Sequence, residues 1–204
     1  MTMFVKICGM TDAAAVAAAT EAGADALGFV FADSVRRLAV DEAVALAKPL
    51  PEGTRKVAVM MHPSKDEFDK VMDLFRPDVL QTDVDDFDYL EVPEQVERWP
   101  VLREGTAYGR RELPELFVYE GKTSGSGEIV DWSVAAALAK RGRMILAGGL
   151  DARNISAAIA AVAPYGVDVS SGVESAPGRK DPAKIRTFID AARNAGSGRR
   201  EQSA

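Results

Sequence analysis

The 204-residue sequence has little of two residue types that build many metal and redox sites, because it contains one cysteine and one histidine. A single cysteine cannot form a disulfide within the chain, which fits the reducing environment of the cytoplasm. Basic residues are in the minority, since 25 Lys and Arg stand against 31 Asp and Glu for a net charge of −6. Nucleic acid is bound by a basic protein face, so we do not expect it as a partner.

Long apolar runs are missing as well. The longest, such as residues 13–19, are alanine-rich and far shorter than the ~20 residues of a membrane span. The first predicted strand begins at Phe4, which leaves no room for a signal peptide ahead of it. A chain of this length fits one domain. We therefore expect a cytoplasmic, single-domain protein that does not enter a membrane.

The sequence does contain eight short segments rich in apolar and β-branched residues, most of them followed by a segment with helical spacing. This alternation predicts an α/β fold with a parallel sheet, and eight strands favour a single-domain (β/α)8 TIM barrel. A doubly wound open sheet is the alternative, but no G-x-G-x-x-G follows the first strand. We assign residues 1–195 to the barrel and 196–204 to a disordered polar tail. The predicted strands are 4–8, 26–31, 56–61, 78–81, 101–102, 116–119, 144–147 and 166–170, and the predicted helices are 13–22, 41–47, 65–75, 92–97, 132–139, 154–162 and 182–195.

Strand alternation sorts the side chains that a barrel would place at its active rim, the carboxyl ends of the strands. In the first strand Lys6 and Cys8 lie on the face opposite the apolar Val5 and Ile7, so both are predicted to point into the barrel, with Cys8 at the rim. The same reasoning places further polar residues on the inner face: Gln81 and Asp83 at the fourth strand, Glu120 at the sixth, and Asp168 and Ser170 at the eighth.

Glycine-containing turns follow the last two predicted strands, at Gly148-Gly149 and Ser171-Gly172. Without a side chain, backbone N–H groups can approach a phosphate closely, and a nearby helix N-terminus adds a favourable dipole. The loops after strands seven and eight of a barrel often form a phosphate site. We predict that these turns bind a sugar phosphate or a phosphorylated cofactor, and two tight turns without a ligand are the simpler alternative.

Several longer motifs carry a family resemblance. The most specific are Lys6 to Thr11 (KICGMT) and Pro164 to Glu174 (PYGVDVSSGVE), and the others are Gly28 to Phe31, Asp131 to Ser133, Ile145 to Leu150 and Gly178 to Ile185. Together they resemble phosphoribosylanthranilate isomerase, an enzyme family of tryptophan biosynthesis. The resemblance runs from Phe4 to about Ala192 and is weak between Met61 and Lys122.

The resemblance implies an Amadori rearrangement, in which an N-aryl phosphoribosylamine opens and isomerises to a 1-arylamino-1-deoxyribulose phosphate, with no cofactor and no metal. The reaction needs an acid for the ring oxygen and a base for the C2′ proton. By resemblance Cys8 is the base, Glu120 occupies the position of the acid, and Arg36 binds the substrate carboxylate. Because a thiol acts as a base only when ionised, we hypothesise that Lys6 lowers its pKa. The predicted substrate-binding residues are Lys6, Arg36, Gln81, Asp83 and Asp168, and the predicted phosphate-binding residues are Gly148, Gly149, Ser171 and Gly172.

Two positions depart from the family pattern. The family's acid is an aspartate, and the extra methylene of Glu120 moves its carboxyl group by more than about 1 Å. The family's Gln-Leu-His-Gly is here Gln81-Thr82-Asp83-Val84, and an acid near the aryl carboxylate would oppose substrate binding. The only histidine, His62, precedes a proline in a loop and is assigned a structural role.

These departures leave two alternatives to phosphoribosylanthranilate isomerisation. One is a paralogue that isomerises a phosphoribosylamine with a neutral or cationic aglycone, which would suit Asp83. The other is a phosphate-binding barrel without catalysis, retained as a regulatory or assembly subunit. In each case the expected partner is a small phosphorylated molecule, and the protein is expected to be a monomer or a homodimer.

Overall fold

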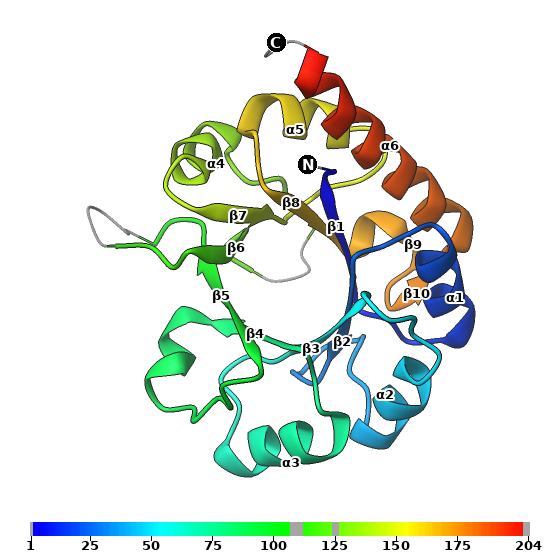
Figure 1. Cartoon of the computed structure of the whole chain (residues 1–204), viewed down its shortest axis with the longest axis vertical. Coiled ribbons are helices and arrows are strands. Elements are labelled where there is room, and N and C mark those ends of the chain that lie inside the picture. Colours follow the sequence, from blue (N-terminus) through cyan, green and yellow to red (C-terminus); the bar gives the residue numbers. More distant parts are fainter. Residues whose placement is uncertain (1, 107–111, 124–126, 202–204) are drawn as a thin grey trace.

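The computed structural model describes residues 2–106, 112–123 and 127–201. Eight parallel strands form a closed barrel in sequence order, with the helices around its outside (Figure 1). The first strand pairs with both the second and the eighth, which closes the ring and confirms the predicted TIM barrel. The strands of the barrel are β1 (Phe4–Cys8), β2 (Ala26–Val30), β3 (Arg55–Val59), β4 (Val79–Asp83), β5 (Glu97–Arg103), β6 (Leu116–Glu120), β7 (Arg143–Leu146) and β8 (Gly166–Val169).

The helices follow the predicted spacing, and their caps explain where several of them begin. Asp12 accepts a hydrogen bond from the Ala15 N–H at the start of α1, and Ser64 forms a capping box with Glu67 at the start of α3. A short hairpin, β9 (Glu174–Ala176) with β10 (Arg179–Lys180), precedes the last helix. The helices are α1 (Ala13–Glu21), α2 (Val40–Ala47), α3 (Lys65–Phe75), η1 (Val84–Asp88), α4 (Trp132–Ala139), α5 (Ile155–Val162), η2 (Ser171–Val173) and α6 (Pro182–Glu201).

One predicted helix is wrong. Residues 92–97 do not form a helix, and the short 3₁₀ helix η1 lies between β4 and β5 instead. Strand β5 begins at Glu97, four residues before the predicted start. Its first residues are polar because they lie at the amino-terminal rim, where Glu97 pairs with Arg55 and Arg98 lies 5.9 Å from the Phe87 ring.

Side-chain alternation divides the core into two layers. Val5 and Ile7 belong to the layer between the strands and the helices, as the sequence predicted. The inside of the barrel is filled by a separate cluster that includes Trp99, with Phe4 packed against it. The Phe4 ring stacks on Tyr165 with ring centroids 5.6 Å apart and meets Trp99 edge-on at 5.7 Å. These aromatic rings fill the amino-terminal half of the barrel, so the interior is open only toward the carboxyl ends of the strands.

Helix α6 covers the seam where β1 meets β8. The Arg193 guanidinium donates to the Gly23 carbonyl at 2.6 Å and pairs with Asp25 at 2.9 Å, and it also contacts the Met3 carbonyl. The structure continues this helix to Glu201, beyond residue 195 where the sequence placed its end, and residues 202–204 lie outside the described part. Gly196 allows this extension because a Cβ there would lie 2.7 Å from the Met3 Cβ.

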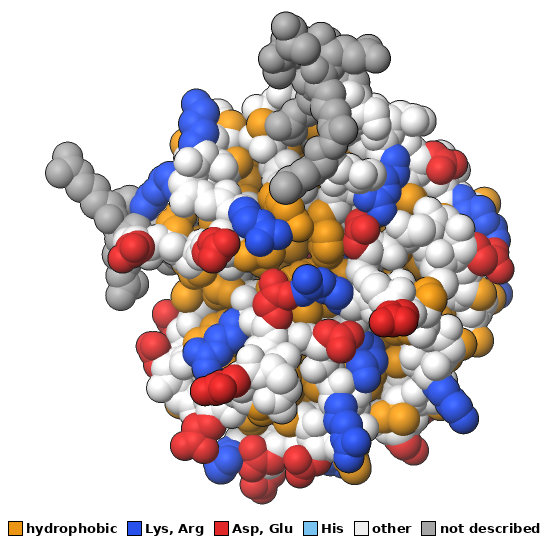
Figure 2. Space-filling view, viewed as in Figure 1, with side chains coloured by type: hydrophobic (Ala, Val, Ile, Leu, Met, Phe, Trp, Pro, Cys, Tyr) orange, Lys and Arg blue, Asp and Glu red, His pale blue; other side chains and the backbone are white. Residues whose placement is uncertain are grey.

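The surface carries both signs of charge. On the face shown in Figure 2, acidic and basic side chains are interspersed among apolar ones, and neither sign forms a continuous patch. Among the helices of the described residues, none combines the length and the apolar character that crossing a membrane requires.

Candidate active site

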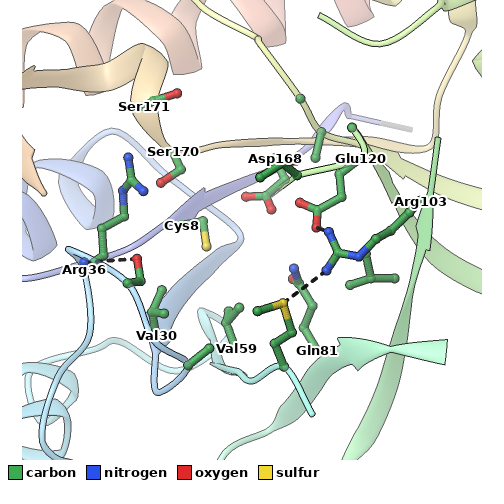
Figure 3. Close-up of a pocket in the computed structure, with 18 of the residues that line it drawn as sticks. Cys8, Val30, Arg36, Val59, Gln81, Arg103, Glu120, Asp168, Ser170 and Ser171 are labelled. Carbon is green, nitrogen blue, oxygen red and sulfur yellow. Dashed lines mark hydrogen bonds and ion pairs between the residues drawn. The ribbon is translucent and has the colours of Figure 1, made fainter. Parts of the chain in front are cut away.

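A cavity of about 620 Å³ opens at the carboxyl ends of the barrel strands. In Figure 3, Cys8, Asp168 and Glu120 point into one space, with Arg36 and Arg103 on opposite sides of it. The position matches the end of a TIM barrel at which active sites are found. The polar and ionisable residues that line it are Cys8, Asp33, Ser34, Arg36, His62, Gln81, Asp83, Arg103, Glu120, Lys122, Thr123, Glu128, Asp168, Ser170 and Ser171.

Cys8 lies at the end of β1 above a buried ion pair. Lys6 is fully buried, and its Nζ donates to Asp168 Oδ2 at 2.8 Å across the β1–β8 pairing. Gly28 on β2 makes room for this group, since a Cβ there would lie 3.0 Å from Cys8 Sγ and 3.1 Å from Lys6 Nζ. Lys6 is therefore a support beneath the cavity and does not line it, in contrast to its predicted role in substrate binding.

The charge state of Cys8 depends on two opposing effects. Burial raises the pKa of the Cys8 thiol, and the positive charges of Lys6 and Lys180 lower it. Burial has the larger effect, so the pKa is raised and the thiol is protonated in the free protein. Lys6 lowers the pKa of Cys8, as the sequence predicted, but burial outweighs this effect. Although burial alone would lower it, the pKa of Lys6 is raised by Asp168 and Cys8, which keeps the ammonium charged.

Glu120 and Asp83 share one arginine. Arg103, at the end of β5, donates through Nη1 to Glu120 Oε1 at 2.7 Å and through Nη2 to Asp83 Oδ1 at 2.6 Å. The strand order explains this, because β5 lies between β4 and β6 and Arg103 is in register with Glu120. The rim is therefore less negative than the acids alone imply, and the charge of Asp83 is offset inside the site.

His62 extends this group of charges. Its Nδ1 lies 2.7 Å from Asp86 Oδ1, and its Nε2 lies 3.2 Å from Asp83 Oδ2. The hydrogen bond with Asp86 and the nearby carboxylates raise the pKa of His62 despite some burial. Asp86 is almost fully buried and also accepts hydrogen bonds from Thr82 Oγ1 and the His62 N–H. His62 thus lines the cavity with a defined polar role that its sequence context did not reveal.

Arg36 lies across the cavity from Arg103 and is already paired. Its Nε and Nη2 donate to the two carboxylate oxygens of Glu174 at 2.6 and 2.8 Å. The buried Lys180 donates to the same carboxylate at 2.8 Å and to Ser170 Oγ at 3.1 Å. Although burial alone would raise it, the pKa of Glu174 is lowered by Arg36 and Lys180. Arg36 lines the cavity as predicted, but its guanidinium is oriented by Glu174.

The glycine turns after β7 and β8 are tightly packed. Gly148 and Gly149 have φ angles of +90° and +62°, and both line the cavity together with Ser171. A Cβ on Gly149 would lie 2.6 Å from the Ile129 nitrogen, so the turn lies close to the segment after β6. Gly172 does not line the cavity, and a Cβ there would collide with the Leu150 carbonyl oxygen. Its absent side chain lets the two turns pack together.

The structure brings most of the predicted site residues to one cavity. Cys8, Arg36, Gln81, Asp83, Glu120 and Asp168 all line it, and so do three of the four predicted phosphate-binding residues. Lys6 and Gly172 support the site from behind it. Gly127, after β6, also lines the cavity, and residues 124–126 lie outside the described residues. Within residues 2–106, 112–123 and 127–201, no group of three or more His, Cys, Asp or Glu could hold a metal ion.

Four residues of the site had no predicted functional role: His62, which was assigned a structural role, and Arg103, Glu174 and Lys180. The alternation of Trp99, Val101 and Arg103 in β5 would have placed Arg103 on the inner face, had the strand been extended to Arg103. Glu174 and Lys180 belong to recognised motifs, but their pairing with Arg36 follows from tertiary structure alone.

Comparison with known proteins identifies the family. The family model described as N-(5'phosphoribosyl)anthranilate (PRA) isomerase matches residues 5–191. An N-(5'-phosphoribosyl)anthranilate isomerase from Listeria monocytogenes is 39% identical over 208 residues, which cover 94% of this chain and 98% of the relative. The crystal structure of TrpF from Jonesia denitrificans is 37% identical with a TM-score of 0.77, over 95% of this chain and 98% of that one. A phosphoribosyl anthranilate isomerase in complex with reduced 1-(o-carboxyphenylamino)-1-deoxyribulose 5-phosphate is 28% identical with a TM-score of 0.80, over 94% and 99%.

Proposed function

Because the chain belongs to the N-(5'-phosphoribosyl)anthranilate isomerase family, we propose that it isomerises phosphoribosylanthranilate in tryptophan biosynthesis with Cys8 and Glu120 as its proton-transferring groups. The observation that carries the assignment is that the thiol at the end of β1 and the carboxyl group at the end of β6 line one cavity. No other cysteine exists in the chain that could serve as the base.

The reaction requires one group that donates a proton to the substrate and one that removes a proton from it. Glu120, when protonated, gives its proton to the ring oxygen as the bond from that oxygen to C1′ breaks, which leaves an iminium ion. Cys8, when ionised, removes the C2′ proton and produces an enaminol. The enaminol becomes the ketose when its 2′-hydroxyl proton is lost and a proton is added to C1′, so the product is an isomer of the substrate.

Two lysines near Cys8 favour the thiolate that this step needs, and the negative charge of Asp168 opposes it. Lys6 and Lys180 both lower the pKa of the thiol, and they oppose the burial that keeps it protonated in the free protein. Removal of water by the bound substrate would strengthen both attractions, because charges interact more strongly at low dielectric constant. Lys6 and Lys180 are therefore positioning residues that stabilise the ionised base.

The phosphate group of the substrate would lie at the turns after β7 and β8. Gly148, Gly149 and Ser171 line the cavity there, and backbone N–H groups at such turns suit an anion. Glu174 orients Arg36 by accepting from its Nε and Nη2 atoms. The third guanidinium nitrogen, Nη1, would bind the aryl carboxylate. The partner is then a small phosphoribosyl compound. The cytoplasmic location of the protein and its state as a monomer or a homodimer stay predictions.

No structural observation favours the changed-substrate alternative. That hypothesis rested on an uncompensated negative charge at Asp83, whereas Arg103 pairs with this carboxylate at 2.6 Å. A substrate with an anionic aryl group is therefore compatible with the site.

The assignment is tested by turnover of phosphoribosylanthranilate and by rescue of a tryptophan-requiring strain that lacks this isomerase. We expect the wild-type chain to rescue growth and Cys8→Ala to lower kcat by about 10²–10⁴-fold, the usual contribution of one acid or base. Glu120→Gln should have a comparable effect, whereas Glu120→Asp should retain activity.

Glu115→Gln is the matched control, because this side chain lies just before the same strand and is 89% exposed. It should turn over at the wild-type rate. Undiminished turnover by Cys8→Ala would refute the base assignment, and absence of turnover by the wild-type chain would refute the proposed activity itself.

A further inference from the structure

Five charged side chains form a continuous chain along one side of the cavity mouth. In order they are Glu120, Arg103, Asp83, His62 and Asp86. When His62 is protonated, the sign of the charge alternates along this chain. Neighbouring members are joined by contacts of 2.7, 2.6, 3.2 and 2.7 Å. Three barrel strands and the loops after β3 and β4 contribute to this chain, so it forms only in the folded protein.

Arg103 contacts both Glu120 and Asp83, and the negative charge of Asp83 limits how strongly Arg103 stabilises the ionised form of Glu120. Its Nη1 atom donates to Glu120 and its Nη2 atom donates to Asp83, whereas Arg36 donates to both carboxylate oxygens of Glu174. Only a fifth of the Arg103 side chain is exposed, and Asp83 and Glu120 are 14% and 15% exposed. Screening by water is therefore weak, and the charge of each partner affects the others strongly.

His62 holds Asp83 in the position where it engages Arg103. Only a protonated imidazole can donate from both ring nitrogens, and both lie within reach of a carboxylate oxygen of Asp83 or Asp86. Asp83 is thereby fixed from two sides, with one oxygen on Arg103 and the other on His62.

The positive charge of Arg103 conflicts with the role of Glu120 as an acid unless another charge offsets it. An arginine beside a carboxylate stabilises the ionised form, but a general acid must carry a proton when the substrate is bound. Asp83 is a negative charge on the far side of the same guanidinium, and it opposes this effect. In the family that this chain resembles, a histidine stands at the position of Asp83 and an aspartate at the position of Glu120. Both positions therefore differ together in this chain.

We propose that Asp83 is a positioning residue for Glu120: by sharing Arg103 it keeps the Glu120 carboxyl group able to hold the proton that the isomerisation transfers. This inference rests on the proposed function, because it assumes that Glu120 is the acid. The remaining ionisable residues that line the cavity do not change when Asp83 is replaced, and they form a constant background: Cys8, Asp33, Arg36, Lys122, Glu128 and Asp168.

The test follows the Glu120 proton directly and through turnover. The carboxyl carbon of ¹³C-labelled glutamate reports protonation by NMR, and Glu120→Gln assigns its signal. Asp83→Asn should move the midpoint of the Glu120 titration to lower pH by about one unit, because the negative charge that offsets Arg103 is then removed. The basic limb of kcat/KM should move the same way, so that activity above the midpoint falls by about tenfold.

Arg103→Met should shift both measurements in the opposite direction, since two carboxylates then lie close together without the cation. Asp85→Asn is the control, because Asp85 is an exposed acid two residues from Asp83 that does not line the cavity, and it should leave both unchanged. A merely structural role would lower activity without these opposite shifts.

The two hypotheses fail in different ways. A Glu120 midpoint that stays in place or rises in Asp83→Asn overturns the inference, whether or not the variant is active. A midpoint that shifts as expected while the basic limb stays in place refutes Glu120 as the acid and with it the catalytic role of Asp83, although the electrostatic coupling would be real.

Discussion

The buried pair of Lys6 and Asp168 allows a quantitative prediction for Lys6→Met. Methionine has a similar length but no charge, so the variant leaves the Asp168 carboxylate without the partner of its Oδ2 atom. Its Oδ1 atom is buried and has no hydrogen-bond partner within the described part of the chain. Breaking one half of a buried pair costs about 3–5 kcal/mol. For a chain of this size the melting temperature should therefore fall by about 6–20 °C.

The loss of stability in Lys6→Met should depend on pH, and the structure determines whether it increases or decreases as the pH rises. Burial raises the pKa of Asp168 above its unfolded value of 3.8. Such a group stabilises the folded state below its unfolded pKa, and that contribution is lost as the pH rises through the folded pKa. Without Lys6 the folded pKa of Asp168 rises further, so the stability difference from wild type should be small at low pH and should increase toward neutral pH.

Urea unfolding followed by tryptophan fluorescence at several pH values measures this difference. Asp168→Asn in the Lys6→Met background should restore most of the stability, because no uncompensated charge remains. A loss below about 1 kcal/mol at neutral pH, or one that the second substitution does not restore, would refute the ion-pair argument.

Two further predictions concern Cys8 and Gly172. Because burial raises the pKa of the only thiol, alkylation of Cys8 by iodoacetamide, followed by mass spectrometry, should show a midpoint above pH 9.0 in the free protein, and Lys6→Met should raise it further. A midpoint below 9.0 would contradict the dominance of burial. Gly172→Ala should destabilise the protein by at least about 1–3 kcal/mol, the usual cost of overpacking, because its Cβ would collide with the Leu150 carbonyl. Gly53→Ala is its control for the loss of a glycine, since open space surrounds that position although its φ of +92° carries backbone strain; equal costs for the two variants would contradict the packing argument.

Local patterns were sufficient to predict the barrel and the inner faces of most strands. Short apolar runs with alternating faces are a property of each segment alone, so Cys8, Lys6, Gln81, Asp83 and Asp168 could be assigned to the interior without tertiary information. Strand β5 was misjudged because Glu97 and Arg98 are polar and Pro100 cannot donate a backbone hydrogen bond. In a closed barrel those polar residues lie at the rim, which no local pattern reveals.

The pairing of the charged side chains was beyond local prediction. Arg103 serves two acids that precede and follow it by 20 and 17 residues, and Arg36 pairs with Glu174 from 138 residues away. Which cation pairs with which acid depends on the order of the strands. It also depends on close packing, such as the space that Gly28 leaves for Lys6. The raised pKa of Cys8 likewise follows from the depth of burial, which sequence spacing does not measure.

The pairing of β1 with β8 has a consequence for how the protein forms in the cell. About 160 residues must be synthesised between these two strands, which takes roughly 10–30 s at ribosomal rates. During that time β1 has no neighbour on one side, and its unpaired edge can pair with other chains. Helix α6, which secures this seam through Arg193, is made after both strands. This edge of β1 therefore stays exposed on the nascent chain until β8 has been made and the ring closes.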